Sequence, residues 1–420
     1  MAEANLEEQC DSRTAVNSQT CIDKWAAHGD TVVALLTGGQ DRPYALGLTM
    51  ALASKGVQLD VVGSDEVDCP EMHTTPGVKF LNFRGDQRRD ASVRRKVTRV
   101  FAYYAKLVRH AATTRAKVFH ILWNNKFEFF DRTALMLYYK LLGKKVTLTA
   151  HNVNAARRDL RDSFLNRLTL KIQYRLASHI FVHTEKMKKE LMDHFRVSEQ
   201  AITVLVHPVN DAFPVTKLTV LEGKRRMGFR EHEKVILFFG RIGPYKGLEH
   251  LITAFQQLSK EAGEYRMILA GEVKGGAEKY IQEIQKRISS DVEAGRIVQR
   301  IQFIPDAEVE LYFKAADVLV LPYLNIFQSG VLFLGLTFGL PVIATDVGSF
   351  KEDILRSGAG LICRPADAAD LASTIRNYFE SSLFKDLARS REAIRTYART
   401  YHSWDAVGRV TRDVYKKVVK

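Results

Sequence analysis

The chain has 420 residues, of which 46% are hydrophobic and 26% are charged, and this composition excludes a disordered scaffold. A chain of this length is too long to fold around one ordinary hydrophobic core, and it indicates two domains of about 200 residues each. The net charge of +14 favours an anionic partner, and nucleic acid, anionic lipid and phosphorylated substrates all satisfy it. Four cysteines without C-x-x-C spacing predict no metal or disulfide framework and fit a reducing cytoplasm.

The N-terminal residues 1–28 are polar and aperiodic, and we expect them to form a loose tail. They lack a basic start followed by an apolar core, so no secretory signal is expected. No stretch reaches the about 20 apolar residues that a membrane span needs. The longest, residues 331–344, contains Gly335, Gly339 and Pro341 and is predicted to be a buried helix followed by a strand.

Short apolar runs alternate with helical patterns along most of the chain, which is typical of parallel sheets covered by helices. In the first half we predict the strands Thr31–Leu36, Gln58–Val62, Val78–Leu81, Val118–Leu122, Val146–Thr149 and Ile180–His183. In the second half we predict Val235–Phe239, Arg266–Ala270, Ile301–Ile304, Val318–Leu321 and Val342–Ala344.

These two sets of strands predict two doubly wound α/β domains, residues 29–212 and 213–400, that face a central cleft. Pro208 and Pro214 interrupt the pattern near the junction. The last part of the chain, from about Leu383, is expected to be helical, with a packed stripe of Tyr397, Tyr401, Trp404 and Val407.

Ligands of open α/β sheets bind beyond the carboxyl ends of the strands, and several candidate residues fall there. Gly38 and Gly39 follow the first strand, where glycine lets the backbone approach a ligand closely, although an ordinary tight turn has the same sequence. His151 follows the fifth strand and is a candidate for substrate contact or for capping the next helix.

The run from Gly240 to Gly247 lies between an apolar strand and an amphipathic helix that begins near Leu248. Lys246 therefore stands near a helix start, where the positive end of the macrodipole disfavours a cation. Together with Arg241 it would suit a multiply charged anion such as a diphosphate. A basic solvated turn is the alternative interpretation.

A second candidate anion site is Gln328-Ser329-Gly330-Val331, which opens an apolar helix. Ser and Gly at a helix start leave backbone N–H groups available to an anion, although a plain serine cap also fits. Two such helix starts within one domain reinforce the interpretation.

Basic residues are concentrated between Arg84 and Lys117, which hold eleven Lys or Arg and two Asp, a net charge of +9. Apolar residues recur there at helical spacing, namely Val93, Val97, Val100, Phe101, Tyr104 and Val108. A basic amphipathic helix is typical of attachment to an anionic membrane surface, and a solvated helix packed on the sheet is the alternative. No recognised nucleic-acid module accompanies the charge, so nucleic acid is not an expected partner.

The second half resembles the donor-binding domain of family 4 glycosyltransferases, the retaining enzymes of the two-domain GT-B architecture. The resemblance rests on Gly240-Arg241 with Lys246-Gly247, Leu269-Ala270-Gly271, Phe303-Ile304-Pro305, Ala316–Pro322 and Gly339–Thr345. Tyr401-His402-Ser403-Trp404-Asp405 is similar to the family's closing motif, so residues 401–420 are expected to return to the first domain. The first half is similar more loosely, through Gly38-Gly39, His151 and His207-Pro208.

The resemblance implies a role for each candidate residue. Arg241 and Lys246 would hold the donor diphosphate, and His151 would approach the transferred sugar. The remaining roles are those of the amides of Ser329, Gly330 and Val331 on the same phosphates, Ile304 and Pro305 at the nucleobase, and Gly38 and Gly39 at the phosphates or sugar.

The sequence departs from the family at two positions that usually hold Glu and that here are Ile326 and Leu334. Asn325 or Gln328 is expected to supply the polar contact to the sugar instead. Because of this departure, a catalytically silent GT-B subunit that binds a partner is the alternative function. An epimerase or hydrolase acting on the donor alone is a third.

The implied reaction is a same-face transfer in which the departing phosphate takes the acceptor's proton, so it needs stabilisation of the diphosphate rather than a carboxylate base. The chain has no Asp-x-Asp, and we expect a metal-independent hexosyltransferase without a cofactor, using a UDP- or GDP-sugar. The acceptor is expected to be lipid-linked, a glycan or otherwise anionic. Arg157, Arg158 and Trp123-Asn124-Asn125 are candidate acceptor residues. The expected location is the cytoplasm, peripheral at the inner face of the membrane.

Overall fold

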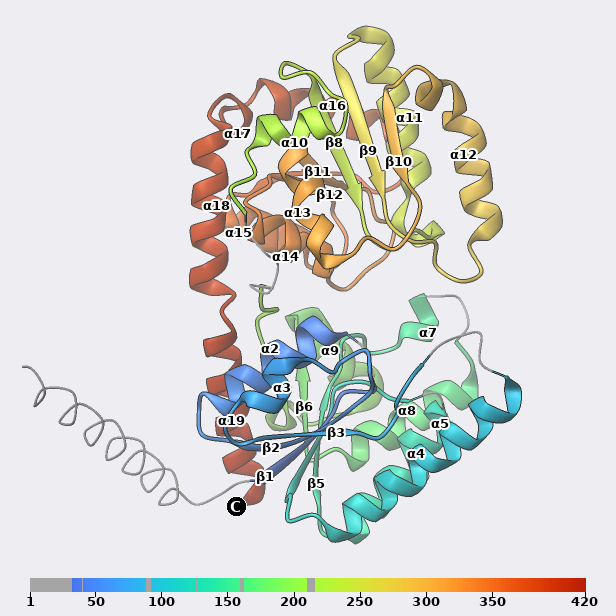
Figure 1. Ribbon diagram of the computed structural model, residues 1–420, viewed down its shortest axis with the longest axis vertical. Helices are drawn as coiled ribbons and strands as arrows, with labels where there is room; N and C mark the ends of the chain where they lie inside the picture. The colour runs from blue at the N-terminus through green and yellow to red at the C-terminus, as the bar shows by residue number, and fades with distance from the viewer. Residues whose placement is uncertain (1–31, 40, 88–91, 126, 159–161, 210–215) are drawn as a thin grey trace, which may run out of the picture. The chain divides into compact units, whose positions relative to one another are not determined.

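The computed structural model describes residues 32–39, 41–87, 92–125, 127–158, 162–209 and 216–420 (Figure 1). The expected tail and Pro214 lie outside these residues. The chain divides into two compact units, each of which is described by itself. Unit 1 comprises the residues up to Thr149 together with Ile172–Ile180 and Gly408–Lys420, and unit 2 comprises Ala150–Lys171 and Phe181–Val407. The domain limits expected from the sequence stay predictions.

The first sheet has seven strands in the order β3-β2-β1-β4-β5-β6-β7, and its pairs from β3 to β5 are parallel. The strands are β1 (Val32–Leu36), β2 (Gln58–Gly63), β3 (Val78–Asn82), β4 (Val118–Ile121), β5 (Lys145–Thr149), β6 (His179–Val182) and β7 (Ile202–Val204). The central strands β1 and β4 are apolar because both of their faces are buried.

Helices connect these strands, as the alternating pattern predicted. They are α2 (Arg42–Ala53), α3 (Pro70–Thr74), α4 (Val93–Thr113), α5 (Glu128–Phe130), α6 (Met136–Leu141), α7 (Ala155–Arg158), α8 (Phe164–Leu176) and α9 (Glu185–Phe195). A π-helical turn, η1 (Asp131–Leu135), joins α5 to α6, and a 3-10 turn, η2 (Glu199–Ala201), precedes β7.

The C-terminal part of α19 (Trp404–Val419) packs within unit 1. A Cβ atom on Gly408 would lie 2.8 Å from the Ala51 carbonyl oxygen of α2, so the two helices approach backbone to backbone. Tyr415 Oη lies 2.5 Å from Nδ1 of His120 in β4. Burial lowers the pKa of His120 to about 3, and this histidine is therefore neutral.

The second sheet has six parallel strands in the order β10-β9-β8-β11-β12-β13. They are β8 (Lys234–Phe239), β9 (Tyr265–Ala270), β10 (Ile297–Arg300), β11 (Val318–Leu321), β12 (Val342–Thr345) and β13 (Gly360–Cys363). The strands β11 and β12 are buried along their whole length and form the centre of the largest hydrophobic core.

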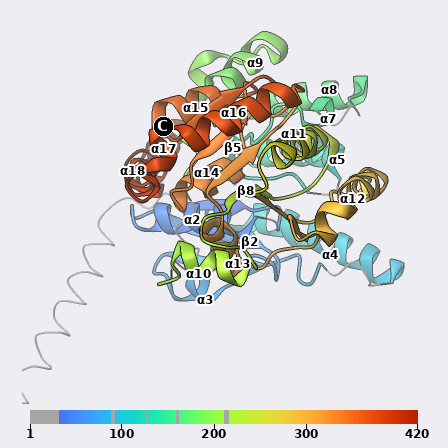
Figure 2. The same cartoon turned by 90° about the horizontal axis from the view of Figure 1, so that it is seen from above.

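Helices cover both faces of this sheet, and Figure 2 shows α11 and α16 on one side of β8 and α10 and α13 on the other. The helices are α10 (Val220–Arg226), α11 (Leu248–Glu261), α12 (Glu278–Glu293), α13 (Asp306–Ala315), α14 (Gly330–Thr337), α15 (Phe350–Ser357), α16 (Ala368–Glu380), α17 (Ser382–Lys385) and α18 (Leu387–Tyr401). A 3-10 turn, η3 (Pro244–Lys246), precedes α11. No helix in the described parts of the chain combines the length and apolarity that crossing a bilayer requires.

The predicted strand Ile301–Ile304 is wrong, because the strand in that region is β10, residues Ile297–Arg300. The sequence pattern also missed β7 and β13. All three lie at a sheet edge, where a strand has one neighbour and is partly exposed, so its apolar pattern is weak. Tyr401 was expected in a packed stripe but is 60% exposed at the end of α18, where the helix stops before α19 begins.

Candidate functional site

In each sheet the strand order reverses at one place, between β1 and β4 in the first and between β8 and β11 in the second. Beyond the carboxyl ends of such a pair, a parallel sheet leaves room for a ligand. The predicted residues follow these strands: Gly38 and Gly39 come after β1, and Gly240 to Lys246 come after β8.

The turn after β8 is held close to neighbouring segments by glycines. Gly240 has a φ of 100°, and a Cβ there would lie 2.9 Å from Val331 Cγ2 and 3.4 Å from Lys246 Nζ. Gly271 has a φ of 143°, and a Cβ on it would lie 2.0 Å from the Gly240 carbonyl oxygen. The structure therefore brings the Gly240 turn, Lys246 and the start of α14 together, as the sequence predicted.

Lys246 is buried, with 4% of its surface exposed. Its Nζ donates a hydrogen bond to Tyr323 Oη at 2.7 Å and lies 4.5 Å from the centre of the Tyr323 ring. Burial raises the pKa of Tyr323, so the phenol is neutral, and its hydroxyl also contacts the side chain of Ser329. Tyr323 fixes the ammonium group in position without neutralising it.

The start of α14 keeps its backbone donors available. Ser329 is the N-cap residue, but its side chain makes no capping hydrogen bond, so the interpretation as a plain serine cap is wrong. Among the described residues, no hydrogen bond engages the backbone N–H groups of Gly330 or Val331. These N–H groups and Lys246 Nζ form a cluster of donors at the positive end of a helix.

The side chain of Arg241 contacts Glu272 rather than the residues of this cluster. Its side chain is 60% exposed, and its Nη2 and Nε lie 2.9 Å and 3.2 Å from Glu272 Oε1. An exposed ion pair of this kind contributes about 0–1 kcal/mol. Arg241 is therefore held by a weak interaction that an incoming anion can replace.

The other predicted donor residues occupy loops beyond the strand ends of the same sheet. Ile304 is buried before α13, and Pro305 is the exposed N-cap residue of that helix. Asn325 is exposed. Gln328 contacts Asp353, and its Oε1 is buried with no hydrogen-bond partner among the described residues.

His151 lies in the loop after β5 and contacts a second histidine rather than capping the following helix. Its Nδ1 lies 3.3 Å from Nε2 of His183, which follows β6. Burial lowers the pKa of His183 to about 4 and that of His207, whose ring lies 5.3 Å from the His183 ring, to about 3. His207 in turn stacks on Phe333 with ring centres 4.5 Å apart.

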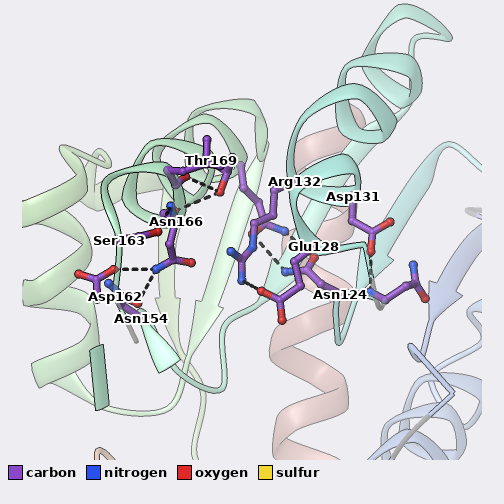
Figure 3. Close-up of polar contacts among 12 residues, drawn as sticks. Asn124, Glu128, Asp131, Arg132, Asn154, Asp162, Ser163, Asn166 and Thr169 are labelled. Atoms are coloured by element: carbon purple, nitrogen blue, oxygen red, sulfur yellow. Dashed lines mark hydrogen bonds and ion pairs between the residues drawn. The ribbon is translucent and has the colours of Figure 1, made fainter. Parts of the chain in front are cut away.

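Downstream of His151, the loop is fixed by hydrogen bonds among polar side chains (Figure 3). Asn166 Nδ2 donates to Asn154 Oδ1 at 3.0 Å and to Asp162 Oδ1 at 2.8 Å, and Asn154 Oδ1 also accepts from the Arg157 amide at 3.2 Å. The Arg157 side chain itself is exposed and lies 3.9 Å from Glu190. The side chain of Arg158 lies outside what the structure describes.

In unit 1, Gly38 and Gly39 have φ angles of 63° and 70°, which favour glycine. A Cβ on Gly38 would lie 2.8 Å from Trp123 Cβ, and one on Gly39 would lie 2.8 Å from Arg84 Cδ. The turn is therefore pressed between the loops that follow β3 and β4. Of the predicted acceptor candidates, Asn124 pairs with Gln173, whose Nε2 donates to its Oδ1 at 2.7 Å, and Asn125 is bound by Tyr103.

Sequence reasoning missed three residues of these regions: Tyr323, Glu272 and the role of Arg84. Glu272 follows Gly271 directly, and Tyr323 follows the predicted strand by two residues, so position beyond a strand end was an available signal for both. Arg84 also lies beyond a strand end, but its position did not distinguish it from the many basic residues that follow it in the sequence.

Two family models match the chain. Residues 38–213 match the model described as Glycosyltransferase Family 4, and residues 221–401 match Glycosyl transferases group 1. The chain belongs to glycosyltransferase family 4. This confirms the resemblance drawn from the Gly240 and Gly339 motifs, and it places the chain in a family of glycosyltransferase enzymes.

Among curated relatives, a D-inositol 3-phosphate glycosyltransferase from Geodermatophilus obscurus is 28% identical over 203 residues, which are 48% of this chain and 45% of that protein. The chain spans about half the length of the first curated relatives it matches.

Solved structures share the fold of this family 4 member. A sucrose-phosphate synthase from Thermosynechococcus elongatus superposes with a TM-score of 0.73 at 16% identity, covering 93% of this chain and 99% of that one. HepE from Anabaena in complex with UDP-glucose superposes with a TM-score of 0.70 at 14% identity, covering 92% and 99%. The predicted GT-B architecture of two Rossmann-like domains is confirmed.

Proposed function

We propose that this chain is a retaining hexosyltransferase that moves a sugar from a UDP- or GDP-sugar to a hydroxyl group of an anionic or lipid-linked acceptor. The observation that carries the proposal is the convergence of Lys246 Nζ, the Gly240 turn and the start of α14. A nucleoside diphosphate has the charge and the oxygen acceptors that suit this cluster of donors.

In the proposed reaction, the acceptor oxygen bonds to the anomeric carbon on the face from which the diphosphate leaves, and the departing phosphate oxygen takes the acceptor's proton. Negative charge grows on the diphosphate as its bond to the sugar breaks. Lys246 and the amides of Ser329, Gly330 and Val331 are placed to stabilise this charge, and Arg241 joins them by exchanging Glu272 for phosphate. The proposal uses cations of the chain in place of a metal ion.

The remaining donor contacts in the proposal come from loops of unit 2. Ile304 and Pro305 line the nucleobase, and Asn325 or Gln328 contacts the sugar in place of the family's Glu residues. His151 approaches the transferred sugar, with a neutral His183 as its neighbour. HepE binds UDP-glucose, and that likeness of fold supports a nucleotide-sugar donor of the uridine type.

The anionic acceptor is supported by the relatives and by the charge of the chain. Several curated relatives are D-inositol 3-phosphate glycosyltransferases, and the compound in that name is a phosphorylated polyol. The segment from Arg84 to Lys117 carries a net charge of +9, and its first residue, Arg84, follows the carboxyl end of β3.

A second element of the proposal is attachment to the cytoplasmic face of an anionic membrane through α4. Three residues of the expected apolar stripe of this helix point outward, with Phe101, Val97 and Val108 being 73%, 48% and 36% exposed, whereas Val100 and Tyr104 of the stripe are partly buried. Tyr103 and Leu107 instead form the buried face. Exposed apolar residues among Arg and Lys side chains are typical of helices that lie in an anionic bilayer surface.

The donor proposal is tested by thermal shift with UDP, GDP, ADP and their common sugar conjugates. We expect one nucleotide to stabilise the wild type and the Arg225→Ala control, whose exposed arginine lies on α10, and to stabilise Arg241→Ala less. Nuclear magnetic resonance of the product then gives the anomeric configuration, and inversion would refute the retaining mechanism.

The alternatives give different products in the same assay. A catalytically silent subunit would bind no nucleotide or would bind one without turnover, and the donor cluster around Lys246 speaks against it. A hydrolase or epimerase would consume the donor with no acceptor present. Transfer that requires the acceptor distinguishes the proposed function from both.

The membrane element is tested by sedimentation with phosphatidylcholine vesicles with and without phosphatidylserine. We expect binding to the anionic vesicles only, and a marked loss of binding in Phe101→Ser. Phe303→Ser is the matched control, because Phe303 is 66% exposed in unit 2 and outside α4. Equal sedimentation of wild type and Phe101→Ser would refute attachment through this helix.

A further inference from the structure

Arg84 is buried, unlike the described arginines and lysines of α4. It is 8% exposed, whereas Arg94, Arg95 and Arg109 on α4 are exposed. Its guanidinium carbon lies 5.3 Å from the centre of the Tyr103 ring, and its Cδ and Nη1 lie beside Gly39. Within the described parts of the chain, no ion pair or hydrogen bond engages its guanidinium group.

Arg84 lines a pocket of unit 1 that is open to solvent. Three cationic residues line it, Arg84, Lys96 and Arg99, and none of its described lining residues is acidic. Burying a charged group is costly unless an opposite charge balances it. Asp131 interacts electrostatically with Arg84, but its two oxygens accept hydrogen bonds from Tyr104 and the Asn125 amide, so the guanidinium N–H groups are left to a ligand. The basic segment thus has an inner face, formed by this pocket, as well as the exposed face of α4.

The opposite wall of the pocket is a fixed polar network around Asp131. Tyr104 Oη donates to Asp131 Oδ1 at 2.9 Å. The Asn125 amide donates to Asp131 Oδ2 at 2.6 Å, and Figure 3 shows the Asp131 side chain with a dashed line at its carboxylate. Tyr103 Oη donates to Asn125 Oδ1 at 2.8 Å. Asp131 is the first residue of the π-helical turn η1, a feature that is frequent at functional sites.

This network determines what the wall offers to a ligand. Burial raises the pKa values of Tyr103 and Tyr104, so both phenols are neutral, and their protons are committed to Asn125 and Asp131. Their oxygens can therefore only accept, which suits the hydroxyl groups of a ligand. The cations on the other side suit a phosphate monoester, which carries a charge of about −1.5 to −2 at neutral pH.

We propose that the pocket bordered by Arg84, Lys96, Arg99, Tyr103 and Asn125 binds the phosphate group of a phosphorylated, hydroxyl-bearing acceptor. The guanidinium fork of Arg84 pairs with two phosphate oxygens beside Gly39, and the phenol oxygens accept from the ligand's hydroxyl groups. This assignment rests on the proposed function, because it identifies the ligand as the acceptor of the transfer reaction. Phosphate binding itself can be measured without that reaction.

Calorimetric titration of the full chain with inorganic phosphate and with sn-glycerol 3-phosphate tests the pocket directly. We expect Arg84→Gln to weaken binding of both by about 10- to 100-fold, the loss typical of hydrogen bonds to a charged group. Arg109→Gln is the control, because Arg109 is an exposed arginine of α4 outside the pocket, and it should leave binding unchanged. Unchanged binding in Arg84→Gln would overturn the proposal.

Because Arg84 supports the Gly39 turn, its variant is checked by thermal unfolding. If Arg84→Gln unfolds early, Lys96→Gln replaces it, since Lys96 is partly exposed at the pocket, and a loss of about three-fold or more is expected from one charge. Titration with acetate and glucuronate separates phosphate from carboxylate recognition. Equal affinity for glucuronate and glycerol 3-phosphate would overturn the phosphate assignment.

The source of the phosphate is distinguished by vesicles of phosphatidylcholine with phosphatidic acid. A lipid headgroup predicts that Arg84→Gln reduces sedimentation with these vesicles, and a soluble phosphate predicts binding of glycerol 3-phosphate alone. Arg109→Gln, whose exposed side chain is outside the pocket, should bind these vesicles as the wild type does. Wild type that hydrolyses a donor but binds no phosphate would refute the pocket, whereas phosphate binding without any nucleotide binding would refute the proposed function.

Discussion

The donor cluster around Lys246 in unit 2 and the pocket around Arg84 in unit 1 each place a buried cation beyond the carboxyl ends of parallel strands, but they are built differently. Lys246 lies beside a short glycine-rich turn, its ammonium group is held by Tyr323, and the other donors of its cluster are backbone N–H groups at the start of α14. Arg84 is positioned by aromatic and amide side chains from α4 and the loop after β4. A site built from backbone leaves a sequence motif, whereas a site built from separate side chains does not.

The largest effect is expected from Lys246→Ala. Losing one donor that stabilises a developing charge typically lowers the turnover number by about 10²- to 10³-fold. Steady-state kinetics with the nucleotide sugar that stabilises the wild type measures it, and Lys260→Ala, an exposed lysine of α11, is the control. A turnover number within a few-fold of the wild type would remove Lys246 from the proposed mechanism and leave Arg84 as the main anion site.

Gly271→Ala is expected to be strongly destabilising. A Cβ there would lie 2.0 Å from the Gly240 carbonyl oxygen, and φ is 143°, so the free energy of unfolding should fall by at least about 2 kcal/mol. Gly275→Ala is the control, since a Cβ there meets nothing within 4 Å.

Gly39→Ala should cost less than Gly271→Ala, because its neighbour is the side chain of Arg84 rather than backbone. It should instead weaken phosphate binding by displacing that side chain. Chemical denaturation of the three variants ranks them, and an equal cost for Gly39→Ala and Gly271→Ala would contradict the distinction between side-chain and backbone construction.

Acid is expected to destabilise the protein, and His207 in unit 2 contributes. Its pKa falls from 6.5 to about 3 on burial, so the unfolded chain binds more protons than the folded one between these values. The contribution of His207 to the free energy of unfolding is therefore fully present above pH 6.5. Between pH 6.5 and about 3 it is lost by about 1.4 kcal/mol per pH unit, the value for one proton. Denaturation at several pH values should show a smaller slope for His207→Phe, which keeps a ring on Phe333, than for the exposed-site control His232→Phe.

The smallest effect is expected from Glu272→Gln. The change removes the carboxylate that pairs with Arg241, so nucleoside diphosphate should bind more tightly, by about two- to five-fold, in keeping with the low strength of an exposed ion pair. Titration with UDP or GDP measures it. Weaker binding would mean that Glu272 contacts the donor itself, and the contrast between a paired Arg241 and an unpaired Arg84 would lose its meaning.

The sequence by itself determined the fold class, the central strands and the membership of family 4. Central strands are buried on both faces, so they appear in the sequence as apolar runs. The turn after β8 and the start of α14 depend on glycines and local backbone geometry, so a short stretch of sequence is enough to recognise them. The edge strands β7, β10 and β13 could not be recognised from the sequence, because they are partly exposed and their apolar pattern is therefore weak.

Only the tertiary structure decided which basic residues meet an anion site. Between Arg84 and Lys117 the sequence has eleven cationic residues that nothing local distinguishes. The pairing of Arg241 with Glu272 joins residues in the loops that follow two different strands, β8 and β9. Burial of Arg84 follows from packing of α4 through Tyr103 and from the π-helical turn that places Asp131 against Asn125. Long-range packing determines the exposure and the partners of each charged side chain, and neither can be inferred from the local sequence.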